Sequence, residues 1–338
     1  MVTLHSLVRE LQSSIIVNRK KAIQSPLKAF QDVWNFGSTL DPIGDDAAIL
    51  ATGNEYILLS CDAIYPQLAA AEPFWAGYCS VLVSVNDIYA MGGKPTAAVN
   101  LLSAPDDQMS ETIAQGMAEA CRKYGVPMVG GHYLPEETAG AATAMIGRAT
   151  HLLRCFHGRP GQWLMAAIDL EGRQFKNYLQ WDSTSFRTPQ DLQSKLAVLP
   201  MLAERQLAAA ARDISNAGLI GTLAMLAETS GCGARVDLNS IPKPYKVDFS
   251  KWIKMFPGYG FILAVDPEHA DKVQALFQKE QITAQVIGEL TEDPRIILHS
   301  EEGEAVLFDW SKESFVVGEN GGQDDGQVRI CESGGRSI

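Results

Sequence analysis

The chain has 338 residues, of which 46% are hydrophobic and 20% charged, with a formal net charge of −12. This length allows two domains with sizeable cores, and the composition excludes a disordered chain. An acidic surface repels nucleic acid and anionic lipid, so neither is an expected partner. No apolar run is long enough to span a membrane, and the six cysteines lack CxxC spacing. We therefore expect a reduced, cytoplasmic protein.

The first half of the chain has the apolar pattern of an α/β unit. Residues 3–17 and about 20–33 are predicted to form two helices or one broken helix. The helix expected over residues 73–91 is apolar on nearly all sides, which predicts that it is buried. Around it the pattern predicts strands at 56–60, 97–103, 126–129 and 143–147, with a second helix at 108–124.

A second unit is expected from about residue 154. Its predicted strands cover 163–168, 260–265, 282–287, 295–299 and 305–309, and its helices cover 189–211, 219–230 and 267–280, with Pro200 splitting the first helix. We therefore expect domains at 1–153 and 154–318. The Gly-rich, polar tail at 319–338, which contains Cys331, is expected to be disordered.

Acidic residues mark the edges of apolar segments between residues 41 and 95. Asp45 and Asp46 lie in the stretch GDDAAI, Asp62 follows the apolar run YILLS, and Asp87 lies on the predicted buried helix. A buried carboxylate without a partner is costly, so Asp87 is expected to contact a metal ion or a polar network. Mg²⁺ prefers carboxylate, water and phosphate oxygens. The pattern therefore indicates a site for a metal–phosphate complex.

Several motifs occur in an order that resembles a known superfamily. They are GDDAAI, Asp62 after a strand, NDIYAMGGKP, the Gly130–Gly131 pair at a strand end, and RDISNAGL. Together they resemble the aminoimidazole ribonucleotide synthetase-like (PurM-like) superfamily over about residues 40–315. The selenophosphate synthetase and thiamine monophosphate kinase branches are nearest in motifs. The resemblance implies an α/β (α+β) fold of two domains, with an N-terminal sheet that pairs across a homodimer and a C-terminal mixed sheet.

The resemblance also implies ATP and Mg²⁺ as cofactors and assigns roles to residues. Gly44, Asp45 and Asp46 would form a nucleotide-binding loop, with Asp45 as a catalytic residue. His132 directly follows the Gly130–Gly131 pair at a predicted strand end, so it is expected to face the same cleft as the aspartates and to be the other catalytic residue. Gly130 and Gly131 would let the backbone approach phosphate, and Ser215 would contact phosphate near a helix N-terminus. The metal ligands would be Asp46, Asp62, Asp87 and Asp213.

Several of these residues have a simpler interpretation. Asp45 could form a turn beside Gly44, and Asp213 could be an ordinary helix N-cap. The basic run at residues 19–21 is interpreted as a solvated helix face. These alternatives stay open at the level of sequence.

The chain also departs from the family pattern. His132 stands where the kinase branch has Asp, and Asn216 stands where Asp is usual; the Gly-rich segment with Cys and Lys that selenophosphate synthetases carry near the N-terminus is missing. The predicted function is an ATP- and Mg²⁺-dependent enzyme that activates an unidentified small molecule by phosphoryl transfer. The alternatives are a non-catalytic nucleotide-binding protein and a maturation or assembly factor.

Overall fold

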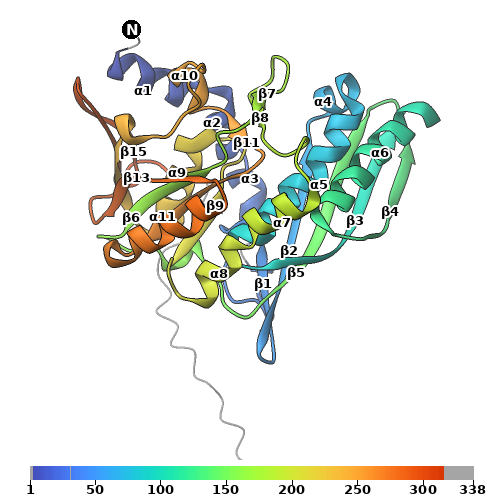
Figure 1. Cartoon of the computed structure of the whole chain (residues 1–338), viewed down its shortest axis with the longest axis horizontal. Helices are drawn as coiled ribbons and strands as arrows, with labels where there is room; N and C mark the ends of the chain where they lie inside the picture. The colour runs from blue at the N-terminus through green and yellow to red at the C-terminus, as the bar shows by residue number, and fades with distance from the viewer. Residues whose placement is uncertain (1–2, 31, 316–338) are drawn as a thin grey trace, which may run out of the picture.

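The computed structural model describes residues 3–30 and 32–315. It contains two large sheets, one in each half of the chain, that lie side by side with helices packed on and between them (Figure 1). The predicted tail at 319–338 lies outside the described residues. Among the described helices, none combines the length and the apolar character that crossing a bilayer requires. The expected two-domain α/β architecture is confirmed.

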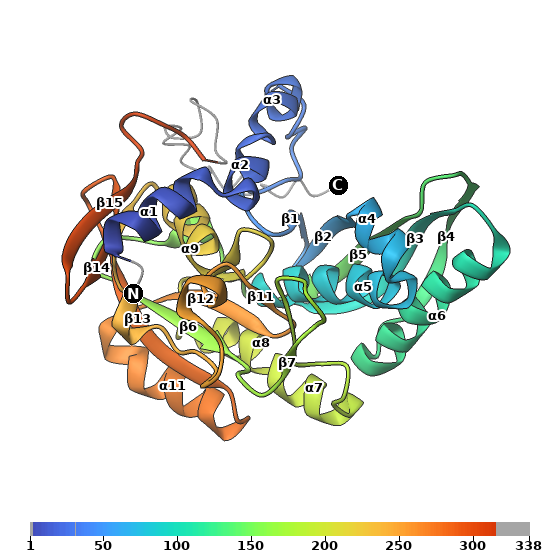
Figure 2. The same cartoon turned by 90° about the horizontal axis from the view of Figure 1, so that it is seen from above.

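The first sheet has the strand order β1-β2-β5-β3-β4, in which only β3 and β4 pair in parallel. Its helices, α4 (Pro66–Ala71), α5 (Pro73–Ala90) and α6 (Asp107–Tyr124), gather on one face of the sheet (Figure 2). Strand β1 was not predicted. The strands are β1 (Ala48–Thr52), β2 (Glu55–Ile64), β3 (Lys94–Ala104), β4 (Met128–Pro135) and β5 (Gly140–Ala149).

Helix α5 is the buried helix that the sequence predicts. A Cβ on Gly77 would lie 2.0 Å from the backbone oxygen of Ile113, and one on Gly116 would lie 1.9 Å from that of Phe74. Only glycine allows α5 and α6 to approach so closely. On its other side α5 is joined to the sheet through Ser84, whose hydroxyl donates to the Thr143 carbonyl at 3.0 Å. Contacts on both sides therefore fix the position of this helix and of the side chains it carries.

The other face of the first sheet has no covering element among the described residues. Side chains alternate along β2, β3 and β5, so that one set packs against the helices while the other set is exposed. The exposed set includes four large apolar side chains, with relative exposures of 43% for Leu59, 43% for Val99, 45% for Leu101 and 43% for Ile146. We call these four side chains the open face.

The second sheet is mixed and has the order β15-β14-β10-β13-β6-β12-β9. The pattern also fails to predict β10, and it assigns helix to residues that form β9. A small sheet, with the order β11-β8-β7, covers the region between the two halves. The main strands are β6 (Trp163–Ile168), β9 (Ala210–Asp213), β10 (Gly233–Asp237), β12 (Gly260–Val265), β13 (Thr283–Thr291), β14 (Arg295–Ser300) and β15 (Gly303–Asp309).

Helices pack on both faces of this sheet. One face carries α7, α8 and α11, whose apolar side chains belong to the same core as α5. The opposite face carries α9, the first part of which lies close to the end of β9. The helices are α7 (Pro189–Leu196), α8 (Val198–Glu204), α9 (Gly218–Thr229), α10 (Phe249–Trp252) and α11 (Ala270–Lys279); the small strands are β7 (Arg173–Gln174), β8 (Gln180–Asp182) and β11 (Phe256–Pro257).

The N-terminal segment forms α1 (Leu4–Ser13), α2 (Ile15–Lys21) and α3 (Gln24–Leu27). Helix α1 buries its apolar face in the core of the second sheet, next to β15. Helix α1 therefore packs with the second unit and not with the first, where the predicted domain 1–153 had placed it. A domain boundary near residue 153 stays a proposal. Helix α2 then carries the chain back toward the region between the units (Figure 2).

Candidate metal and phosphate site

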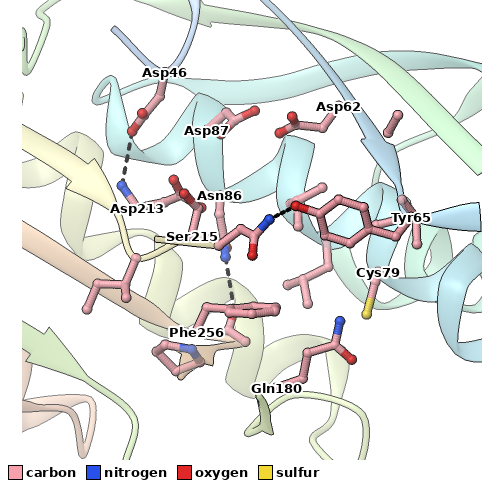
Figure 3. A pocket seen from close by; sticks show the side chains of 18 of the residues that line it. Asp46, Asp62, Tyr65, Cys79, Asn86, Asp87, Gln180, Asp213, Ser215 and Phe256 are labelled. Carbon is pink, nitrogen blue, oxygen red and sulfur yellow. Dashed lines mark hydrogen bonds between the residues drawn. The ribbon is translucent and has the colours of Figure 1, made fainter. Parts of the chain in front are cut away.

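A cavity of about 480 Å³ lies between the two halves of the chain (Figure 3). Helix α5 and strand β2 form one wall, and the end of β9 with the loop before α9 forms another. The GDDAAI loop and helix α2 also contribute residues to its lining. The cavity therefore collects segments that are far apart in the sequence.

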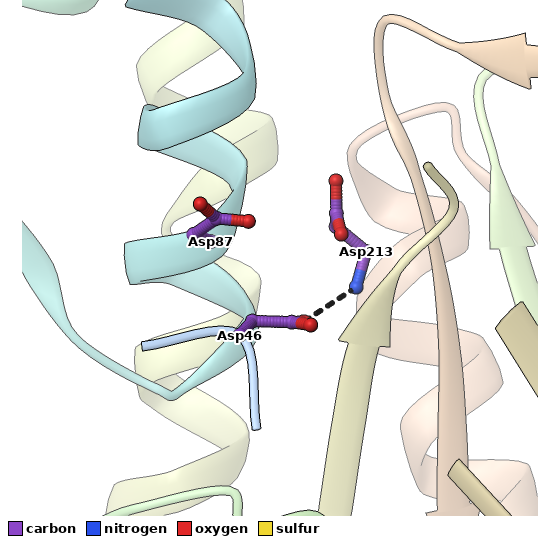
Figure 4. A group of neighbouring side chains, drawn as sticks. All are labelled: Asp46, Asp87 and Asp213. Carbon is purple, nitrogen blue, oxygen red and sulfur yellow. Dashed lines mark hydrogen bonds between the residues drawn. The ribbon is translucent and has the colours of Figure 1, made fainter. Parts of the chain in front are cut away.

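Three aspartates meet at one end of this cavity. Asp46 comes from the loop before β1, Asp87 from α5 and Asp213 from the end of β9, and one carboxylate oxygen of each lies within 4.8 Å of the others (Figure 4). The Asp46 carboxylate also accepts a hydrogen bond from the backbone N–H of Asp213, at 3.0 Å. Three carboxylates at this spacing offer the hard oxygen donors that Mg²⁺ prefers.

Burial makes this arrangement costly in the absence of a cation. Burial raises the pKa of Asp87 well above its usual range, and the neighbouring charges of Asp62, Asp213 and Asp46 raise it further. Burial and the charge of Asp46 act in the same way on the pKa of Asp213. A bound divalent cation would remove both penalties, because it neutralises the charges that repel one another.

Asp62 lies beside this group but is not one of the three. It is within β2 rather than after the strand, so the predicted strand end at residue 60 is wrong. The alternation along β2 turns Leu58, Ser60 and Asp62 toward the helices, which brings Asp62 into the cavity lining near Asp87 (Figure 3). Its role as a metal ligand remains a prediction, and its negative charge adds to the field of the trio.

The GDDAAI loop is held by Arg212, which the sequence analysis did not single out. The guanidinium of Arg212 pairs with Asp46 at 3.0 Å and donates to the Gly44 carbonyl at 2.8 Å. The hydroxyl of Thr229 donates to the same carbonyl at 3.2 Å. In the sequence, Arg212 directly precedes Asp213 in the motif RDISNAGL. A cation next to a predicted metal ligand was the signal that could have identified Arg212 as a residue of the site. It positions the loop and supplies a positive charge beneath the acidic group.

Asp45 is directed toward the second unit. Its carboxylate accepts a hydrogen bond from the Cys155 backbone N–H at 2.9 Å, and burial raises its pKa to about 7. This contact joins the loop to a distant part of the chain and is not the local turn that Asp beside Gly can form. Asp45 also lines the cavity, and its predicted catalytic role stays a prediction.

The basic run at residues 19–21 is only partly the solvated face that was predicted, because Arg19 is exposed whereas Lys20 and Lys21 are half-buried. Arg19 and Lys20 line the cavity, and the Arg19 guanidinium lies 4.5 Å from the ring centroid of Tyr65. Lys21 pairs with Glu313 at 2.7 Å. Helix α2 thus brings two cations to an acidic cavity, where they complement the aspartates and suit a phosphate group.

Gly130, Gly131 and His132 lie elsewhere. They are in the middle of β4 rather than at a strand end, and they are absent from the lining of the cavity. His132 pairs with Leu101 across the sheet, so it belongs to the same side as the open face. The expectation that His132 faces the aspartates within its own chain is therefore wrong, because β4 is the far edge strand of the sheet.

Ser215 and Asn216 line the cavity in the loop between β9 and α9. The Asn216 amide donates a hydrogen bond to the Tyr65 hydroxyl, whose ring also stacks with Arg19. The backbone N–H of Ser215 donates to Thr222 at 3.3 Å. Asn216 therefore connects the two walls of the cavity, and the predicted phosphate contact of Ser215 remains a prediction.

Both halves of the chain are similar to known proteins. The chain matches the AIR synthase related protein N-terminal domain over residues 44–149 and the C-terminal domain over residues 160–301. It is 37% identical to the uncharacterized protein sll0787 of Synechocystis sp., with 84% of this chain and 89% of that protein aligned. It is also 25% identical to a selenide, water dikinase of Colwellia psychrerythraea, over 73% of this chain and 83% of the dikinase.

Solved structures share the fold. T. maritima PurL complexed with ATP superposes with a TM-score of 0.70 at 17% identity, covering 87% of this chain. The chain spans about half of that protein, 51% of its length. The two domain matches follow one another in the order of the two sheets, and the sll0787 alignment extends over most of both proteins. The chain belongs to the AIR synthase-related, or PurM-like, family.

Proposed function

We propose that the protein is an ATP- and Mg²⁺-dependent enzyme that activates a small molecule by phosphoryl transfer. The main support is the group formed by Asp46, Asp87 and Asp213 in a cavity that Arg19 and Lys20 also line. Phosphoryl transfer depends on positioning and charge neutralisation more than on covalent help from the protein. A selenide, water dikinase aligns with the chain, and PurL complexed with ATP shares its fold. Both similarities support this class of reaction.

Each residue of the site would have a separate role. Asp46, Asp87 and Asp213 would hold Mg²⁺, which supplies charge neutralisation to the phosphates when bound. Arg212 holds the Asp46 carboxylate in place through its 3.0 Å ion pair. Lys20 would add positive charge where the transferred group passes. The small sheet and α5 enclose the cavity and limit the access of water, which would compete with the acceptor.

A nucleotide-binding protein without turnover is the second candidate. The departures at His132 and Asn216 motivated it, but Asn216 contacts Tyr65 in the cavity wall and is not one of the three clustered carboxylates. A maturation factor is the third candidate. Such a factor would usually use a flexible C-terminus that carries a cysteine, and Cys331 lies outside the described residues. The three clustered carboxylates favour the enzyme over the non-catalytic nucleotide-binding protein.

A metabolite screen tests the proposal. The purified protein is incubated with ATP, Mg²⁺ and pools of small metabolites, and the release of ADP or AMP and phosphate is measured. We expect one pool to stimulate nucleotide consumption above the rate with ATP alone, and the variant Asp213→Asn to remove the stimulation. Binding of ATP without stimulation by any pool would favour the non-catalytic candidate.

We also propose a homodimer formed through the open face. Leu59, Val99, Leu101 and Ile146 are four large apolar side chains, each 43–45% exposed, on one face of the sheet, and an exposed apolar patch of this kind marks a surface for interaction. A second copy of the same face would cover it. Light scattering at micromolar concentration is expected to give twice the monomer mass, and Leu101→Lys is expected to shift it toward the monomer. A wild-type monomer would contradict the proposal.

His132 keeps a proposed phosphate role only across such a dimer. It lies on the side of the open face, so a second copy could place it near the nucleotide of the partner. His132→Asn is expected to lower ATP–Mg²⁺ affinity without changing the dimer mass. His132→Asp should restore affinity only at raised Mg²⁺. If both variants bind ATP like the wild type across a Mg²⁺ titration, His132 has no phosphate role.

A further inference from the structure

The cavity has a second half whose lining is largely apolar. It lies beyond Asn86 from the aspartates, where α4 and α5 face the small sheet (Figure 3). An apolar lining is unfavourable for phosphate and for metal ions, so this half must accommodate another part of a ligand. The apolar lining consists of Leu68, Trp75, Cys79, Leu82, Phe256 and Pro257.

Asn86 places a hydrogen-bond acceptor at the edge of this half. Its Nδ2 donates to the Gly258 carbonyl at 3.1 Å, which fixes the orientation of the amide. Its Oδ1 is buried and has no hydrogen-bond partner among the described residues, and the residue is only 4% exposed. Buried polar atoms are almost always paired, so an unpaired oxygen in a cavity wall indicates a donor on the ligand.

Gln180 places a donor in the same half. Its Oε1 accepts a hydrogen bond from the Trp75 indole N–H at 2.6 Å, so its Nε2 is the end left for a ligand. Figure 3 shows that nitrogen turned toward Cys79. The Trp75 ring is itself stacked between Tyr78 and Phe175, at centroid distances of 5.4 and 4.3 Å. This stack fixes Trp75 and, through it, the direction of the Gln180 amide.

We propose that this half of the cavity binds a neutral, planar group that both donates and accepts hydrogen bonds, such as a carboxamide or a nitrogen heterocycle. The group donates to Asn86 Oδ1, accepts from Gln180 Nε2 and packs its faces on the apolar lining. The inference deepens the proposed function, on which it rests for the identity of the ligand. Two molecules of that reaction can carry such a group: the phosphoryl acceptor and the adenine base of ATP.

The test uses Gln180→Met, which keeps the length of the side chain and removes the donor together with the oxygen that accepts from Trp75. Gln115→Met, on the exposed surface of α6, is the matched control. The probes are benzamide, which has a donor and an acceptor, and acetophenone, which has the same ring and carbonyl but no N–H. Their binding is measured by ligand-observed NMR, and the affinities of ATP–Mg²⁺ and of tripolyphosphate–Mg²⁺ are measured by calorimetry.

We expect wild type and Gln115→Met to prefer benzamide to acetophenone, and Gln180→Met to weaken benzamide about five-fold, the effect of one neutral hydrogen bond. Unchanged ATP affinity in Gln180→Met then assigns the site to the acceptor. A five-fold loss for ATP with none for tripolyphosphate assigns it to adenine.

The inference is overturned if the wild type does not distinguish the two probes and Gln180→Met binds ATP like the wild type. Tripolyphosphate–Mg²⁺ reports on the acidic half independently. If it fails to bind while benzamide is still selected, the proposed function fails and this inference stands.

Discussion

Asp87→Asn is expected to remove most of the Mg²⁺-dependent ATP binding while the protein remains folded. Asp87 supplies one of the three clustered carboxylates, and the amide that replaces it keeps the shape but not the charge. Loss of a direct ligand should cost at least the roughly 10–100-fold that changes around a metal site typically cost. Calorimetry with ATP and Mg²⁺ measures the effect.

The metal-free form of this variant should be more stable than the wild type. Burial and three neighbouring aspartates raise the pKa of Asp87, which means that its ionised form is disfavoured in the folded protein. The neutral amide removes that penalty at neutral pH. Asp271→Asn, on the exposed surface of α11, is the control and should change neither property. A variant that binds ATP–Mg²⁺ as well as the wild type would make Asp87 a structural residue only.

Arg212→Met is expected to destabilise the protein by about 3–5 kcal/mol, the usual cost of leaving a buried charge without its partner. Arg212 neutralises Asp46 at 3.0 Å and holds the Gly44 carbonyl at 2.8 Å, and both contacts join the GDDAAI loop to β9. The free energy of unfolding in urea, measured without metal, reports the loss.

Arg235→Met is the matched control, because Arg235 pairs with Glu304 on the surface. An exposed pair of this kind contributes about 1 kcal/mol or less. If Arg212→Met is no more destabilising than Arg235→Met, the GDDAAI loop does not depend on the buried cation.

The acidic residues could be identified from the sequence because the residues next to each of them indicate its environment. Asp87 was recognisable because it is a carboxylate on a helix that is apolar on nearly all sides, and the structure places it against Asp46 and Asp213. The motif order then located Asp46 and Asp213, which come from different halves of the chain. These predictions required only residue type, local burial and order.

The errors have physical causes. Residues 210 and 211 were assigned to a helix because they lie in the stretch LAAAAR, which is rich in alanine, the best helix former. The structure places them in β9, fully enclosed between β12 and the helices, so tertiary packing overrides propensity there. Likewise β1 is a short edge strand of mixed exposure, which leaves little periodicity to detect.

Residues that act through distant contacts could not be located from local pattern. Lys20 and Arg212 are cations whose importance depends on aspartates that lie elsewhere in the chain. His132 follows a motif that suggested proximity to the aspartates, yet its strand is at the far edge of the sheet. Strand order places Arg212 and His132, and the packing of helix α2 places Lys20. The sequence reveals neither.

Titration of ATP into the wild-type protein, once with Mg²⁺ and once with EDTA, tests the central claim most directly. Without a cation, the buried carboxylates of Asp46, Asp87 and Asp213 repel the triphosphate. When Mg²⁺ is present, the carboxylates and the triphosphate can bind the same cation. We predict binding with Mg²⁺ and little or no binding with EDTA. Equal binding under the two conditions would contradict the assignment of these three aspartates as the metal site that holds the nucleotide.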